Sequence, residues 1–175
     1  MIPRALDIRG LLSGGDRRSI ARSDQVRALV EKKPELVQEL AGLTDDEDWL
    51  VAQRAFDLLE KIARDHLDWI EPHKRVFIGP QAGSDKWEIR LQIVRSLPLF
   101  TWPAKDLARV KMILLENATY PQTFVKAWAL DSLATFALKD APLMPIVQHH
   151  LEVFDRSESK ALQARARKIR ERLEL

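Results

Sequence analysis

The sequence predicts an all-α protein built from repeated pairs of helices. Helix-favouring alanine, leucine, arginine, glutamate and lysine dominate, and the 175 residues include only 6 glycines. Alternating runs of β-branched residues, which are typical of strands, do not occur. Four segments about 37 residues apart share one pattern of apolar positions. We therefore expect a right-handed α-α superhelix, a solenoid of four helix pairs with an N-terminal capping helix.

The repeated pattern lies in the second helix of each pair. Four twelve-residue windows begin at Val51, Ile89, Val125 and Leu162, which are 38, 36 and 37 residues apart. Their first, fifth and twelfth positions are apolar, and the ninth is leucine except for Arg170 in the last window. Offsets of four, four and three place these positions on one helix face. We expect the core to bury Val51, Ile93, Leu97, Ala129, Leu133, Phe136 and Ile169.

A shorter helix that begins with proline precedes each window. Proline suits the first helical turn because its missing N–H has no partner there in any case. The four prolines are Pro34, Pro72, Pro103 and Pro142. The expected N-caps are Thr44, Ser84 and Ser157 within the repeats and Ser23 before a capping helix that starts at Asp24. The repeats span about residues 34–66, 69–101, 103–140 and 141–174, within a single domain of residues 23–175.

We expect residues 1–22 to form a separate N-terminal arm, which contains the sequence LLSGGDRRSI. Its Gly14-Gly15 pair lacks the preceding strand and the Lys-Ser/Thr of a phosphate-binding loop. The glycines instead predict a flexible hinge, or the turn of an arm that folds back on the repeats or docks on a partner. The arm could bury Leu11, Leu12 and Ile20. Arg17 and Arg18 would then lie within reach of the acidic residues 45–48.

Composition and charge narrow the class of protein. The chain has no cysteine, which excludes disulfides and thiolate chemistry, and its net charge is only +2. No apolar run approaches the roughly 20 residues of a membrane span, and the first ten residues lack the apolar core of a secretory signal. We expect a cytoplasmic protein without cofactor or metal. The four histidines, His66, His73, His149 and His150, lack the spacing of metal ligands.

Two of the windows resemble the second helix of HEAT/armadillo-type repeats. They are EIRLQIVRSL (88–97) and FVKAWALDSL (124–133). Their basic column holds Arg90 and Lys126, whereas Ala52 and Gln163 occupy it in the other two repeats. The Trp, Leu-Gly and Tyr pattern of tetratricopeptide repeats is missing. The arm, the capping helix and the four repeats together are similar to a group of uncharacterised bacterial HEAT-repeat proteins.

The resemblance implies that the second helices line the concave face of the solenoid. Their outward positions therefore form the candidate contact surface. Arginine and tryptophan there are typical of protein interfaces. The candidate residues are Arg54, Asp57, Lys61, Arg95, Trp128, Asp131, Arg165, Lys168 and Arg172, with Gln92 and Thr135 on the same stripe. We expect a non-enzymatic adaptor or scaffold that binds a protein partner of unknown identity.

Three alternatives stay open. The protein could bind nucleic acid, and Trp128 and Asp131, three residues apart on one helix, could serve like the aromatic and acidic residues of DNA-alkylation repair glycosylases. It could also act by assembling with copies of itself. The basic helix of residues 159–175 could lie on a polyanion or a membrane surface.

Overall fold

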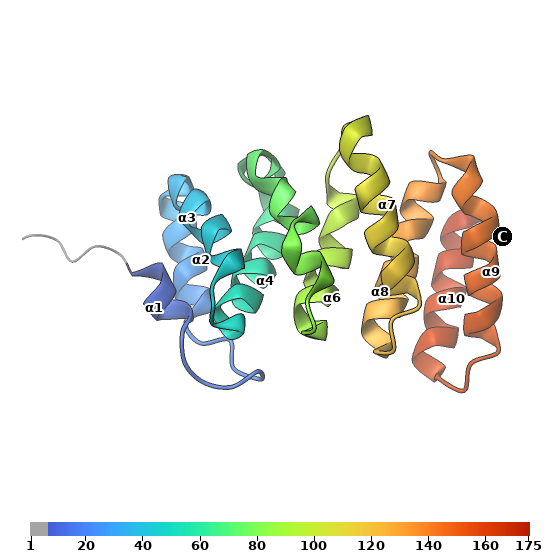
Figure 1. The fold of residues 1–175 in the computed structure, drawn as a ribbon, viewed down its shortest axis with the longest axis horizontal. Helices are drawn as coiled ribbons and strands as arrows, with labels where there is room; N and C mark the ends of the chain where they lie inside the picture. The colour runs from blue at the N-terminus through green and yellow to red at the C-terminus, as the bar shows by residue number, and fades with distance from the viewer. Residues whose placement is uncertain (1–6) are drawn as a thin grey trace, which may run out of the picture. The chain divides into compact units, whose positions relative to one another are not determined.

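The computed structural model describes residues 7–175, and all regular structure within them is helical. They contain ten α-helices, α1 to α10, several of which are separated by 3₁₀-helices, and no strand (Figure 1). The prediction of an all-α protein is therefore confirmed. The chain divides between Gln92 and Ile93 into two compact units, which we call the N-terminal unit and the C-terminal unit and describe separately.

The N-terminal unit is built around one long helix. Its helices are α1 (Ile8–Leu12), α2 (Ser23–Lys32), α3 (Val37–Gly42), α4 (Trp49–Asp65) and α5 (Leu67–Ile70). Helix α4 contacts the other four. It buries Phe56 and Leu59 completely, and the Phe56 ring lies 5.6 Å from that of Phe77. Burial of side chains of this size contributes about 1.5–3 kcal/mol each, so α4 is the main apolar support of the unit.

The segment after α5 does not form the α-helix expected to begin at Pro72. It forms a 3₁₀-helix over Glu71–Ile78 and a second one over Pro80–Gly83. Pro80 disfavours helical geometry at the residue before it, and Gly79 accordingly has an extended backbone. Helix α6 (Trp87–Ser96) and a 3₁₀ turn over Leu97–Leu99 follow.

Four helices make up most of the C-terminal unit. They are α7 (Ala104–Ala118), α8 (Thr123–Ala137), α9 (Met144–Asp155) and α10 (Lys160–Leu173), with a 3₁₀ turn over Ala141–Leu143. Helix α8 packs against α7, α9 and α10. Its Val125, Ala129 and Leu133 are completely buried. This packing fixes the orientation of α8, and with it the positions of Trp128 and Asp131.

Six of the seven residues expected in the core are completely buried, which confirms those predictions: Val51, Ile93, Leu97, Ala129, Leu133 and Ile169. The prediction for Phe136 is wrong, because this side chain is only half-buried. It lines a groove in the C-terminal unit together with Trp102.

Several helix ends differ from expectation by a few residues. Asp48, rather than Thr44, caps α4 by accepting a hydrogen bond from the N–H of Leu50 at 2.9 Å. The Thr44 hydroxyl is buried and donates to the carbonyl of Ala41. The N-cap of α10 is Ser159 in place of Ser157, and α2 begins at Ser23 itself. Within residues 7–175, no helix combines the length and apolarity that crossing a membrane requires.

Candidate functional site

Arg54 does not lie on an exposed surface as expected. It is only 2% exposed, and its guanidinium group donates hydrogen bonds to three backbone carbonyls of the arm. Nη1 reaches the oxygen of Leu12 at 2.6 Å, Nη2 that of Asp16 at 3.0 Å and Nε that of Ser19 at 3.0 Å. The arm thus covers this part of α4. Among residues 7–175, Arg54 has no carboxylate partner, so carbonyl dipoles alone compensate its buried charge.

The glycine pair forms the turn that brings these carbonyls to Arg54. Gly14 has φ of 81° and Gly15 has φ of 71°, both in the left-handed region that favours glycine. The apolar anchors of the arm differ in part from those predicted. Leu12 is completely buried, Leu11 is half-buried, and Ile20 is 50% exposed.

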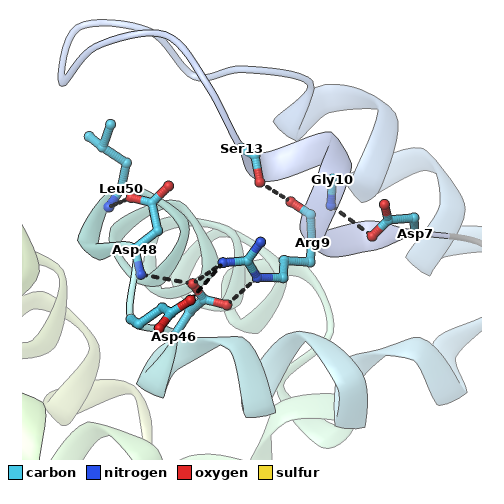
Figure 2. A network of polar contacts seen from close by, with 8 residues as sticks. Asp7, Arg9, Gly10, Ser13, Asp46, Asp48 and Leu50 are labelled. Carbon is cyan, nitrogen blue, oxygen red and sulfur yellow. Dashed lines mark hydrogen bonds and ion pairs between the residues drawn. The ribbon is translucent and has the colours of Figure 1, made fainter.

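Arg9 joins the arm to the acidic turn before α4 (Figure 2). Its Nε lies 2.7 Å from Oδ2 of Asp46 and its Nη2 lies 2.9 Å from Oδ1. Asp46 also accepts a hydrogen bond from the N–H of Asp48 at 2.9 Å. The hydrogen bond from Arg9 holds the pKa of the Asp46 carboxyl below its usual value. A planar guanidinium that binds both oxygens of one carboxylate fixes the orientation of α1.

The expected contact of Arg17 and Arg18 with residues 45–48 is not formed, because Arg9 occupies that position. Arg17 approaches Glu88, with Nη1 and Oε1 4.0 Å apart. The side chain of Arg18 is exposed and has no ion pair among residues 7–175. Sequence reasoning missed both Arg9 and Asp46. Asp46 lies within the acidic run, but nothing in the sequence marks a helix as short as α1.

The predicted stripe residues Asp57 and Lys61 pair with each other on α4. Lys61 Nζ lies 2.7 Å from Asp57 Oδ2, one helical turn away. Such exposed pairs contribute about 0.3–0.5 kcal/mol. They form a local pair in the N-terminal unit.

In the C-terminal unit, Asp131 of α8 holds two arginines of α10. Its Oδ2 lies 2.6 Å from Nη1 of Arg165, and its Oδ1 lies 2.6 Å from Nη1 of Arg172. Nη2 of Arg172 also donates to the main-chain oxygen of Asp131 at 2.8 Å. Each carboxylate oxygen thus accepts one charge-assisted hydrogen bond. Asp131 is itself 8% exposed, so solvent competes little for these bonds.

Trp128, one turn before Asp131 on α8, carries two guanidinium groups on its ring. The central carbon of the Arg165 guanidinium lies 4.0 Å from the ring centroid, and that of Arg95 lies 5.1 Å from it. Tryptophan is the best aromatic partner for such cations. Arg165 therefore has both a carboxylate and an indole ring as partners, which restricts its rotamers. Trp128 stays half-buried, with part of its surface open to solvent.

These residues form one patch, which we call the Trp128 cluster: Arg95, Trp128, Asp131, Arg165, Lys168 and Arg172. Lys168 lies between the two arginines along α10, is exposed, and has no ion pair among residues 7–175. The cluster contains four cationic side chains and one carboxylate. It can bind groups that carry negative charge. Sequence reasoning did not foresee that the acidic member would be buried between two arginines.

No group of three or more His, Cys, Asp or Glu side chains within residues 7–175 is arranged to hold a metal ion. Comparisons with protein-family models and with curated proteins find no match for this chain.

Proposed function

We propose that this protein is a non-enzymatic adaptor or scaffold of the cytoplasm, and that it binds another protein through the Trp128 cluster. The observation that carries the proposal is the fixed position of the Trp128 ring and the Arg165 guanidinium. Tryptophan and arginine are the side chains most enriched among residues that dominate binding energies. Because contacts within the cluster already restrict Arg165, less side-chain entropy is lost when a partner binds.

The contacts of Asp131 and Trp128 support protein binding over glycosylase chemistry. A catalytic carboxylate needs an oxygen that faces the substrate, but both oxygens of Asp131 accept hydrogen bonds from arginines. A base that stacks on the ring of Trp128 would have to displace a guanidinium group, because Arg165 lies 4.0 Å and Arg95 5.1 Å from the ring centroid. The sequence resemblance to HEAT/armadillo-type repeats, whose second helices line a concave binding face, also supports an adaptor role.

The proposal is tested by affinity capture with the full chain and one charge-reversed variant. The bait is incubated with a nuclease-treated bacterial lysate, and bound proteins are quantified by mass spectrometry. We expect Lys168→Glu to lose at least one protein that the wild-type chain retains. The matched control is Arg167→Glu, which makes the same charge change at the preceding residue. Successive helical residues point about 100° apart, so residue 167 faces away from the cluster.

Two results would contradict the proposal. One is retention of the same proteins by the wild type and Lys168→Glu. The other is retained material that consists of nucleic acid when nuclease is omitted and that is lost steeply with added salt. Steep salt dependence is typical of phosphate contacts, and that result would favour the nucleic-acid alternative.

A further inference from the structure

An apolar groove lies beside the Trp128 cluster in the C-terminal unit. Its volume is about 430 Å³, within the range of ligand-binding pockets. Its apolar lining consists of Pro98, Phe100, Trp102, Leu107 and Phe136. We call it the α8 groove, because Thr135 and Phe136 near the end of α8 form one of its sides.

The groove and the cluster are contiguous. The main-chain oxygen of Asp131 accepts a hydrogen bond from Nη2 of Arg172 at 2.8 Å and one from Oγ1 of Thr135 at 3.3 Å. Arg172 belongs to the cluster and Thr135 lines the groove, so one oxygen atom joins the two. A chain segment that lies along α8 would therefore contact both.

The mouth of the groove carries excess positive charge. Lys111 and Asp140 form an ion pair there. Lys139 is exposed beside them and has no ion pair among residues 7–175. Lys168, in the Trp128 cluster, is likewise exposed and has no ion pair among residues 7–175. An occupant of this surface thus meets an apolar floor between two lysines that form no ion pair with any of residues 7–175.

Resting on the proposed function, we infer that the partner contributes a peptide segment with one large apolar side chain flanked by carboxylates. The apolar side chain fills the α8 groove, and the carboxylates pair with Lys139 on one side and with Lys168 and Arg172 on the other. Burial of an aromatic or large aliphatic side chain supplies the binding energy. The charges set the direction and the choice of partner.

The test is a selection from a phage-displayed library of random peptides on the immobilised full chain. Parallel selections use the variants Thr135→Trp, which narrows the groove, and Lys139→Glu, which reverses the charge at its mouth. The control variant is Lys33→Glu, an exposed lysine of the N-terminal unit. Because Lys139 is exposed, its substitution leaves the core intact even if Thr135→Trp perturbs folding.

We expect the wild type and Lys33→Glu to enrich peptides in which an aromatic or large aliphatic residue lies within a few positions of Asp or Glu. An enriched peptide, labelled and measured by fluorescence anisotropy, should bind Lys139→Glu and Thr135→Trp about tenfold more weakly or worse. Replacement of its apolar residue by serine should cause a similar loss.

Other outcomes overturn the inference. Enrichment of basic peptides, of no peptide, or of acidic peptides that bind Thr135→Trp and Lys139→Glu as well as the wild type would each exclude the groove as the apolar site. Displacement of the peptide by a short single-stranded DNA at equal concentration would indicate a polyanion surface instead. If acidic peptides bind Thr135→Trp and Lys139→Glu as well as the wild type, loss of binding in Lys168→Glu would still uphold the proposed function. The inference about the groove and the proposed function can therefore fail separately.

Discussion

The Nη1 of Arg54 donates a hydrogen bond to the carbonyl oxygen of Leu12 at 2.6 Å, although the two residues are 42 positions apart. Two further bonds, to Asp16 and Ser19, attach the arm to the same guanidinium. The sequence LLSGGDRRSI therefore supplies main-chain acceptors for a buried arginine. The glycines permit the turn, and the buried arginine holds it in place.

We expect Arg54→Met to loosen the arm. Methionine fills part of the space but donates no hydrogen bond, so three carbonyls lose a partner. Unsatisfied buried polar groups cost about 1–3 kcal/mol each, less where water can reach them. The free energy of unfolding, measured in urea, should fall by about 1–3 kcal/mol, and amide exchange over residues 7–22 should accelerate. Lys61→Met on the same helix is the control and should change neither quantity appreciably. Equal exchange in both variants would contradict the role of Arg54.

Gly15→Ala should destabilise the arm more than Gly14→Ala. Both positions have positive φ, where a side chain costs about 1–2 kcal/mol. At Gly15 an added Cβ would also lie 2.8 Å from Cβ and Oγ of Ser19, whereas nothing lies within 4 Å of a Cβ at Gly14. Thermal melts and amide exchange of the arm would compare the two. Equal effects would show that the turn does not fix Ser19.

The contact between Arg9 and Asp46 should be lost in acid. The pKa of folded Asp46 is lowered by the hydrogen bond from Arg9, so it lies below the unfolded value of about 3.9. The contact therefore stabilises the fold above that value and is lost as pH falls through the folded pKa. Amide relaxation measured by NMR should report faster motion of residues 8–12 in acid, while far-UV circular dichroism still shows native helix.

Asp46→Asn is the variant that checks this assignment. It should show the loosened arm already at neutral pH, with little further change in acid. Asp45→Asn changes the exposed neighbour and should keep the wild-type pH dependence. A wild-type response in Asp46→Asn would assign the transition to another group.

The core could be predicted from the sequence because its apolar period repeats. Ile93, Leu97 and Leu133 occupy positions that recur with the helix pairs, and all three are completely buried. Phe136 follows the same period yet lines a groove, since the side chains opposite it leave space unfilled. The 3₁₀-helices after α5 were not predicted. The apolar pattern contains no information on backbone geometry, such as the extended conformation that Pro80 favours at Gly79.

The repeat predicts one part of the Trp128 cluster but not another. Trp128 and Arg165 are both fourth residues of their windows, so neighbouring second helices bring them together. The burial of Asp131 between two arginines depends on side-chain rotamers, which no period encodes. Arg54 was predicted to lie on the exposed face of α4, but it is buried by the arm, which is distant in sequence.

Leu133→Asp should unfold the C-terminal unit. Leu133 is completely buried in α8, and an unpaired carboxylate in a packed core costs several kcal/mol. Circular dichroism should show loss of helix or a melting temperature lowered by many degrees. Leu138→Asp is the control, because Leu138 is 59% exposed just beyond the same helix. A melt of Leu133→Asp that resembles this control would contradict the packing of α8.

Asp131→Asn should cost more stability than Arg172→Gln. In Asp131→Asn the amide oxygen can accept from only one of Arg165 and Arg172, the amide NH2 faces the other guanidinium, and the anion that the two arginines share is lost. Hydrogen bonds to charged groups contribute about 1.5–3 kcal/mol each. In Arg172→Gln the carboxylate keeps Arg165, and the lost partner is 40% exposed, so the cost should be about 1 kcal/mol or less.

Urea unfolding at two salt concentrations distinguishes the loss of hydrogen bonds from the repulsion between the arginines. Added salt screens this repulsion and should partly restore the stability of Asp131→Asn alone. Equal losses in the two variants, or a salt effect of the same size in both, would mean that Asp131 does not hold the two arginines together.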